Sequence, residues 1–419
     1  MNSYKEVNIP KIEKSILVIS DLVKEVAVMM HDGYLFALIY PDFQEVKSRK
    51  IIHLENEIRW YAVELYNMKA ENSHKIKGYQ IVRAPLPKDM RGEIDRSRLE
   101  AFMKEQASFL IEAEEEPKDT VYIQIKDFLS TLTSDPVLPS SHFEFDLHLD
   151  SLNYVELFTF LDKSFTVHIS ESEFSQMMTV EALYHYVSEK KQKITYTEVN
   201  WNMILSEKID YEPVTSAGYL KLYKTLFLPL FKLYFSLKIY NTENIPDQPC
   251  IIAPNHQSML DGFIMAAALP DKVLKKMFFL AFEMVFGTKI MRPIIQRAQA
   301  ILINYNDNLK ASMQKSAVVI NKGYNLLIFP EGARTRDREL LEFKKFFAIL
   351  SIEFNIPIVP VVLDGTFESM PAGKLFPRPS PVVVKYLDPI YPEGLSYDEL
   401  AAKVKEAIHE EMIKHPLHS

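Results

Sequence analysis

The sequence predicts a multidomain α/β protein in three parts. Its 419 residues exceed the length of one typical domain. Residues 112–120 are acidic and contain a proline, which is the composition of a linker, and the spacing of apolar residues changes after them. We therefore expect a small α/β subdomain at residues 1–111, a helical bundle at residues 120–194, and an α/β domain with a mixed sheet flanked by helices at residues 200–419.

Composition and charge narrow the possible functions. A net charge of -8 and a pI of about 5.8 lack the basic surface that binding a phosphate backbone requires, so we expect no nucleic-acid partner. The single cysteine, Cys250, excludes an intrachain disulfide and a multi-cysteine zinc site, and we expect no metal. No basic segment leads into an apolar run at the N-terminus, so we expect a cytoplasmic protein.

The first two parts differ in the period of their apolar residues. In the first, KEVAVMM and YLFALIYP favour strands and KIIHLENEIRWYAVELYN favours a helix. In the second, VYIQIKDFLSTL, SLNYVELFTFLDKSF and TVEALYHYVSEKK have helical spacing, which predicts three or four packed helices. Asp150 and Ser151 stand at a helix start. There they could merely cap the helix, or Ser151 could carry a phosphate group that the helix dipole favours.

The third part contains short β-branched runs separated by helical patterns. PCIIAP, AILIN, YNLLIFP, IPIVPVVL and PVVVKYL are the expected strands. Before them, residues 219–240 are rich in leucine and aromatic residues but contain Pro229 and four lysines, so they are too interrupted to span a bilayer. They fit a pair of short helices in the bilayer interface, with the lysines at the headgroups, or a helical hairpin packed on its own domain. These lysines are Lys221, Lys224, Lys232 and Lys238.

His256 and Asp261 form a candidate base with its orienting carboxylate. A histidine where PCIIAP ends can reach a substrate in the crevice at the carboxyl end of a sheet. A bend could bring Asp261 to the other ring nitrogen, fixing the tautomer. Ser258 lies between them, but a helix would point it away, so the pair predicts activation of a substrate hydroxyl that attacks an acyl donor.

A second candidate segment is LLIFPEGARTRD, residues 326–337. A strand-like run stops at its proline and gives way to a glycine and charged side chains. Arginine forks and backbone amides freed by a glycine suit a phosphate monoester, although an ordinary polar turn has the same composition. The candidate residues are Glu331, Gly332, Arg334 and Arg336.

Together these motifs resemble the phospholipid and glycerol acyltransferases, the lysophosphatidate acyltransferase family, over about residues 215–392. The family's Asn-His-four residues-Asp motif stands at residues 255–261, its Phe-Pro-Glu-Gly-x-Arg motif at residues 329–334, and its strand proline at Pro360. The resemblance implies that His256 is the general base and Asp261 orients it, and it supports membrane docking by residues 219–240. It also implies a substrate-binding role for Asn255, Glu331, Gly332 and Arg334.

The family's remaining motif departs from the pattern. Gln299 takes the place of its glycine and Tyr305 the place of an arginine that contacts phosphate. An acceptor other than lysophosphatidate, such as a lyso-amino-acid lipid, is therefore an alternative, although Arg297 or Arg334 could compensate.

Residues 122–190 resemble acyl carrier proteins. Asp150, Ser151 and Leu152 form the Asp-Ser-Leu motif, and the following helix runs into LDKSFTVHISESEF. The resemblance implies 4'-phosphopantetheine on Ser151, attached by a phosphopantetheinyl transferase. Acidic residues would guide docking to partner enzymes; these are Glu144, Asp146, Asp150 and Glu156.

Residues 86–99 resemble the end of the C-terminal subdomain of acyl-CoA synthetases and other adenylate-forming enzymes. That family has a lysine after the glycine, whereas Glu93 follows Gly92 here, with Lys88 and Arg91 nearby. We also expect no large nucleotide-binding domain before this subdomain, where that family has one. Residues 1–111 are therefore interpreted as a relic, a docking platform, or the partner of a separate adenylation domain.

The combined prediction is an O-acyltransferase. It would move a fatty acyl group from acyl-CoA or an acyl carrier thioester to a lysophospholipid or glycerol-phosphate-type hydroxyl, at the inner face of the cell membrane. A lyso-amino-acid lipid is the alternative acceptor. A non-catalytic carrier and scaffold protein is the alternative from another class.

Overall fold

The computed structural model describes residues 8–31, 33–70, 74–107, 115–282, 297–303, 309–335, 338–371 and 376–414. Its internal contacts divide the chain into two compact units, Met1–Glu198 and Val199–Ser419. The first unit contains both the predicted α/β subdomain and the predicted bundle, so their division into two domains stays a prediction. The mixture of helices and sheets in the two units confirms the multidomain α/β class.

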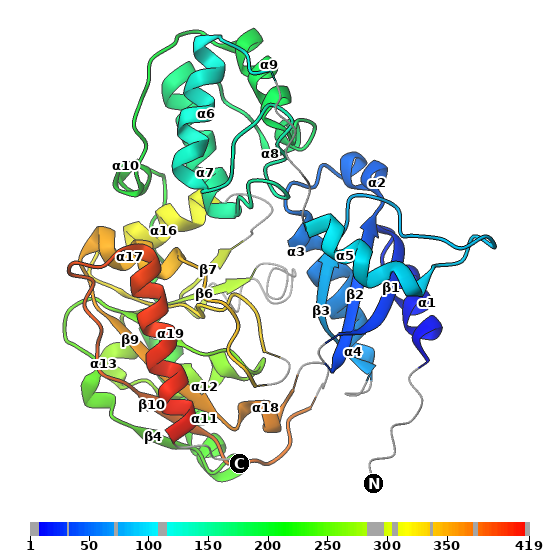
Figure 1. The fold of residues 1–419 in the computed structure, drawn as a ribbon. Coiled ribbons are helices and arrows are strands. Elements are labelled where there is room, and N and C mark those ends of the chain that lie inside the picture. The colour runs from blue at the N-terminus through cyan, green and yellow to red at the C-terminus, as the bar shows by residue number, and fades with distance from the viewer. Residues whose placement is uncertain are drawn as a thin grey trace. The chain divides into compact units, whose positions relative to one another are not determined.

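Residues 8–107 of the first unit, here called the N-terminal subdomain, are built on the sheet β1-β2-β3 (Figure 1). β1 (Val23–His31) pairs antiparallel with β2 (Tyr34–Pro41), which pairs parallel with β3 (Ile76–Ile81). β3 was not predicted from the sequence, because polar residues and Gly78 interrupt its apolar pattern. That glycine is needed, since a Cβ there would lie 2.7 Å from the ring of Phe36. The helices are α1 (Ile9–Ile19), α2 (Phe43–Ser48), α3 (Leu54–Ile58), a π-helical segment (Arg59–Glu64), α4 (Leu65–Lys69), a 3-10 turn (Arg96–Arg98) and α5 (Leu99–Ala107).

Residues 115–198, here called the helical bundle, confirm the predicted helical part of the chain. The helices are α6 (Thr120–Leu132), α7 (Ser151–Phe165), α8 (Glu171–Phe174) and α9 (Val180–Lys190). Their apolar faces meet in one core, where the rings of Phe128 on α6 and Phe160 on α7 stack with centroids 4.1 Å apart. Figure 1 shows α6, α7 and α9 side by side.

The second unit is built on one mixed sheet with the strand order β4-β10-β9-β5-β8-β6-β7. β5, β6, β7, β8 and β9 run parallel, and β10 pairs antiparallel with β9. The five predicted strands are present, but β4 and β6 were not predicted. The strands are β4 (Lys238–Tyr240), β5 (Ile251–Pro254), β6 (Met277–Phe282), β7 (Ala300–Ile303), β8 (Asn325–Leu327), β9 (Ile358–Asp364) and β10 (Val383–Tyr386).

Helices cover this sheet and close its core. Ile252 of β5 and Val359 of β9 lie in one buried cluster with residues of α11 and α12, while α19 packs on β9 and α17 (Figure 1). The central strands are buried along their length, as expected of parallel strands covered by helices. The helices are α10 (Trp201–Ser206), α11 (Ala217–Tyr234), α12 (Asp261–Ala268), α13 (Asp271–Leu274), α16 (Leu309–Asn321), α17 (Phe346–Phe354), α18 (Thr366–Ser369) and α19 (Tyr397–Lys414).

α11 corrects the prediction of two short helices at residues 219–240. It is a single helix of 18 residues with Pro229 inside it. Proline removes one helical hydrogen bond, but Leu220 and Phe231, on either side of it, are both buried in the core and hold the two halves in line. None of the helices in the described part of the chain is long and apolar enough to cross a membrane.

Candidate active site

The site begins where β5 ends, at the central strand of the sheet. Asn255 follows the strand and is fully buried. Its side-chain nitrogen donates to the carbonyl of Leu363 at 3.0 Å, and its side-chain oxygen accepts from the amide of Leu363 at 2.7 Å. These bonds tie the loop to β9 and give Asn255 a positioning role. Because the side chain is buried, the predicted contact between Asn255 and substrate is not supported.

His256 and Asp261 meet as the sequence predicted. Nδ1 of His256 lies 2.9 Å from Oδ2 of Asp261, the first residue of α12. The same carboxylate oxygen accepts the backbone amides of Gln257 at 2.6 Å and Ser258 at 2.7 Å. Asp261 is fully buried, whereas the histidine side chain is 18% exposed. The bond at Nδ1 places the proton there, so Nε2 is the nitrogen that can accept a proton from a substrate.

Ser258 takes no part in this pair, but not for the predicted reason. It lies in the loop before α12 and not in a helix. Its hydroxyl donates to the carbonyl of Met370 at 2.8 Å, accepts the amide of Leu260 at 3.2 Å, and is buried. These contacts occupy the hydroxyl of Ser258, so this serine is not positioned as a nucleophile for His256 to activate.

The segment after β8 packs directly on His256. The ring of Phe329 stacks on the imidazole with centroids 4.2 Å apart. One carboxylate oxygen of Glu331 accepts the backbone amide of His256 at 2.6 Å, and the other accepts the amide of Leu341 at 2.9 Å. Burial raises the pKa of Glu331 to about 7. The structure thus gives Glu331 a positioning role, whereas the resemblance implied contact with the acceptor. Sequence reasoning missed the role of Phe329, although it precedes the motif's proline.

Gly332 and Arg334 continue the same loop. Gly332 has φ 62, in the left-handed region that glycine adopts without strain. Arg334 is half-buried, and the next amide, that of Thr335, donates to the carbonyl of His256 at 2.8 Å. The loop with the predicted phosphate ligands therefore contacts His256. Arg336 lies outside the described residues.

Gln299, at the position of the family's glycine, has the left-handed backbone conformation that glycine adopts most easily. Its φ is 57, and its side chain is buried. The side-chain oxygen accepts the amide of Ser216, just before α11, at 2.9 Å, and the nitrogen donates to the carbonyl of Met277 in β6 at 2.7 Å. Gln299 thus links α11 to the sheet. Tyr305, at the position of the family's arginine, lies outside the described residues.

The comparisons with known proteins fit this geometry. Residues 236–364, which include His256, Asp261 and Glu331, match the family model described as Acyltransferase. The chain contains an acyltransferase domain. The predicted recognition of this domain is confirmed.

Named relatives agree with the acyltransferase match. The chain is 32% identical over 181 residues to a 1-acyl-sn-glycerol-3-phosphate acyltransferase of Limnanthes douglasii, and the alignment covers 42% of this chain and 62% of the relative. It thus spans less than two thirds of that relative. The solved acyltransferase PlsC of Thermotoga maritima has 25% identity and a TM-score of 0.42, covering 48% of this chain and 81% of that one.

A further solved structure, that of McyG A-PCP with phenylalanyl-adenylate, has 17% identity and a TM-score of 0.23, covering 42% of this chain and 30% of that one. Both structural overlaps are too low to assign an activity. Roles inferred from the resemblance to acyl carrier proteins and adenylate-forming enzymes are therefore proposals.

Ser151 is the first residue of α7 and is half-buried. Asp150 caps this helix, since its carboxylate accepts the amides of Leu152 at 2.8 Å and Asn153 at 3.1 Å. The capping interpretation is thus correct, and these amides are already bonded to a carboxylate. A partly exposed serine at this place still fits attachment of phosphopantetheine.

The outer face of α11 carries a stripe of apolar side chains. Leu222, Leu226 and Leu233 are 58%, 60% and 84% exposed, and their spacings of four and seven residues place them on one side of the helix. Lys224 does not reach outward as predicted, because its ammonium group bonds the carbonyl of Leu269 and the carboxylate of Asp271, both at 2.7 Å.

Among the described residues, no group of three or more His, Cys, Asp or Glu could hold a metal ion.

Proposed function

We propose that this protein transfers a fatty acyl group from an acyl thioester to a hydroxyl of a lysophospholipid or similar glycerol-phosphate acceptor. The observation that carries the proposal is the bond between Nδ1 of His256 and Asp261, which leaves Nε2 on a partly exposed ring beside a glycine and arginine loop.

The chemistry follows from this arrangement. Nε2 of His256 takes the proton of the acceptor hydroxyl as its oxygen attacks the thioester carbonyl. Asp261 stabilises the imidazolium that forms, because its buried carboxylate already faces the other ring nitrogen. The carbon–oxygen bond forms, the carbon–sulfur bond breaks, and the imidazolium returns its proton to the leaving thiolate. The backbone amide and carbonyl of His256, bonded to Glu331 and Thr335, keep the ring in place during both transfers.

The donor is acyl-CoA or an acyl carrier thioester. Phosphopantetheine, when attached to Ser151, would supply the thiol that holds the acyl chain. A tethered donor would reach a high effective concentration at the site, which supports a carrier within the same chain. Intact mass after coexpression with a phosphopantetheinyl transferase tests this point, with Ser151→Ala as the control. An unmodified wild-type chain would remove the carrier role.

The apolar stripe of α11 supports peripheral docking to a membrane surface, where lysolipid acceptors reside. Leu222, Leu226 and Leu233 would enter the headgroup boundary, while the exposed Lys221 and Lys232 would meet anionic headgroups. We propose, as the sequence analysis expected, that this docking takes place at the cytoplasmic face of the cell membrane.

The acceptor headgroup has one specific alternative. Because Gln299 replaces the motif's glycine and is used to link α11 to β6, a lyso-amino-acid lipid without a phosphate monoester remains the second candidate.

The test is acyl transfer by wild type, His256→Ala and the control His409→Ala, which changes an exposed histidine of α19. The acceptors are lysophosphatidate, a lysolipid lacking the phosphate monoester and a lyso-amino-acid lipid, each with acyl-CoA and acyl carrier donors. Transfer to lysophosphatidate that is lost only in His256→Ala supports the proposal. Transfer only to acceptors without a phosphate monoester supports the alternative acceptor. Absence of His256-dependent transfer to all acceptors would favour the scaffold.

A further inference from the structure

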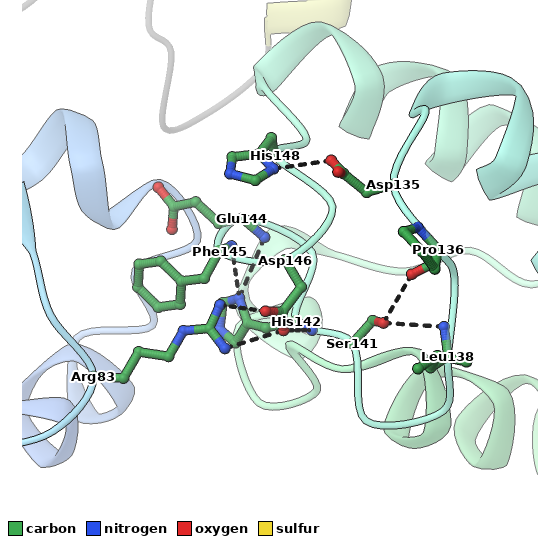
Figure 2. A network of polar contacts seen from close by, with 10 residues as sticks. All are labelled: Arg83, Asp135, Pro136, Leu138, Ser141, His142, Glu144, Phe145, Asp146 and His148. Carbon is green, nitrogen blue, oxygen red and sulfur yellow. Dashed lines mark hydrogen bonds and ion pairs between the residues drawn. The ribbon is translucent and has the colours of Figure 1, made fainter. Parts of the chain in front are cut away.

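An acidic loop of the helical bundle, residues 142–146, contacts the N-terminal subdomain. Figure 2 shows its centre, where the guanidinium of Arg83 makes two bonds to the carboxylate of Asp146, at 3.1 and 2.6 Å. Both side chains are 30% exposed, so this forked pair is partly shielded from water. The same guanidinium lies 4.9 Å from the ring centroid of Phe145, which packs against the core of the N-terminal subdomain.

Glu144 adds a second charged contact beside this pair. Its carboxylate accepts the backbone amides of Leu54 at 3.3 Å and Glu55 at 2.9 Å. These are the first two amides of the helical segment that begins with α3, and the side chain of the preceding residue, His53, does not cap them. First-turn amides lack helical partners, so a carboxylate from the bundle satisfies groups that the N-terminal subdomain itself leaves open.

Apolar contacts surround the charged ones. The ring of His53 stacks on that of Tyr154, on α7, with centroids 5.1 Å apart, and both residues are buried. Burial lowers the pKa of His53 to about 4, so the ring is neutral at neutral pH. The rings of Phe43 and Phe145 meet edge to face at 6.5 Å. The contact thus combines buried aromatic rings with polar groups, as specific protein interfaces do.

The acidic loop is held in shape by its own bonds before it meets the subdomain. Nδ1 of His142 accepts the amides of Glu144 at 3.2 Å and Phe145 at 3.4 Å, and Asp146 accepts the amide of His142 at 2.7 Å (Figure 2). A preformed loop loses little conformational freedom on docking, which favours binding.

The N-terminal subdomain also lacks the positively charged lysine that adenylate-forming enzymes have after the glycine of this motif. Glu93, at the position of that family's lysine, is exposed, and nearby Lys88 is bonded to Glu25 at 2.5 Å. The sequence left three interpretations open for residues 1–111. The contacts with the bundle favour the interpretation as a docking platform.

We propose that the N-terminal subdomain is the docking platform of the helical bundle, and that Glu144, Phe145 and Asp146 are the residues by which the bundle recognises it. The loop ends five residues before Ser151. The platform therefore fixes the segment that leads to the attachment serine, and these acidic groups serve a partner within the chain before any separate enzyme.

The test is hydrogen exchange in the full-length chain, comparing wild type, Arg83→Glu, Asp146→Arg and the double variant. Each single reversal places like charges together, so we expect exchange at the amides of Leu54 and Glu55 to rise about tenfold, although neither amide touches Arg83 or Asp146. The double variant restores opposite charges and should return exchange toward wild type. Arg49→Glu is the control, since Arg49 bonds Asp21 and Glu45 within the N-terminal subdomain.

Amides of β1 and α6 report folding of the two parts in every variant. Arg83→Gln, which removes the charge without reversing it, gives the same test should a reversal disturb those reference amides. Unchanged exchange at residues 54 and 55 in Arg83→Gln and the reversals would overturn the proposal. A double variant no closer to wild type than the singles would overturn it as well. These readouts do not depend on acyl transfer, so failure here is distinct from failure of the proposed function.

Discussion

Glu331→Gln tests whether the buried carboxyl beside His256 is protonated in the folded protein. The unfolded carboxyl loses its proton near pH 4.5, whereas burial raises its pKa in the folded chain to about 7. Folding therefore takes up a proton between these values. The contribution of Glu331 to stability is fully present below pH 4.5 and is lost as pH rises through 7. A shift of this size corresponds to about 3 kcal/mol.

Glutamine has no such titration, and its side-chain nitrogen cannot accept a hydrogen bond. One of the two amides that Glu331 now serves, those of His256 and Leu341, would lose its acceptor, at a cost of roughly 1–3 kcal/mol. At pH 5 we expect the variant to be less stable than wild type by that amount. At pH 8 the difference should shift by about 3 kcal/mol in favour of the variant.

The assay uses the placement of the two tryptophans, Trp60 in the first unit and Trp201 in the second. In a Trp60→Phe background, the fluorescence of Trp201, which is buried, reports urea unfolding of the second unit alone. Glu393→Gln, a change at an exposed carboxylate of the same unit, is the control. A stability difference between Glu331→Gln and its parent that is equal at pH 5 and pH 8 would refute the reasoning.

Three other substitutions test separate features. Asp261→Asn should lower kcat by about 10³–10⁴-fold with little change in KM, because the imidazolium loses its counter-charge; steady-state kinetics giving an unchanged kcat would contradict this role. Leu226→Glu should reduce partition of the protein onto anionic vesicles about tenfold or more in a sedimentation assay. Ile413→Glu, which also replaces an exposed apolar side chain by a carboxylate but lies on α19, should leave this partition unchanged. Gln299→Gly should relieve a left-handed backbone yet destabilise the second unit by about 1–2 kcal/mol, since two buried bonds are lost; thermal unfolding at or above the wild-type midpoint would show that the link is dispensable.

The sequence predicted the elements that have strong local patterns. The central strands β5 and β9 and the helices α6 and α7 were visible because apolar runs or helical spacing persist over their whole length. Short or diluted strands such as β3 and β4 were not, since their pairing comes from neighbours distant in the chain. The spacing of His256 and Asp261 allowed their pairing, because a loop before a helix can close over five residues, and the second motif and the family resemblance made the pair a prediction.

The roles of other motif residues depended on contacts that no local pattern contains. Asn255 and Glu331 look like substrate ligands in the sequence, yet their side chains bond backbone groups of Leu363 and His256, distant along the chain. Asp146 looked like a surface charge for separate enzymes, yet it meets Arg83. In each case the partner is set by tertiary packing, which residue spacing does not encode.

The proline inside α11 limits how far this helix can sink into lipid. Pro229 has no N–H to donate to the carbonyl of Thr225, on an exposed part of the helix. A carbonyl without a partner is costly in hydrocarbon but is readily hydrated among headgroups. If α11 docks as proposed, such a helix would stay at the wet boundary of the bilayer, where the polar end of a lysolipid lies.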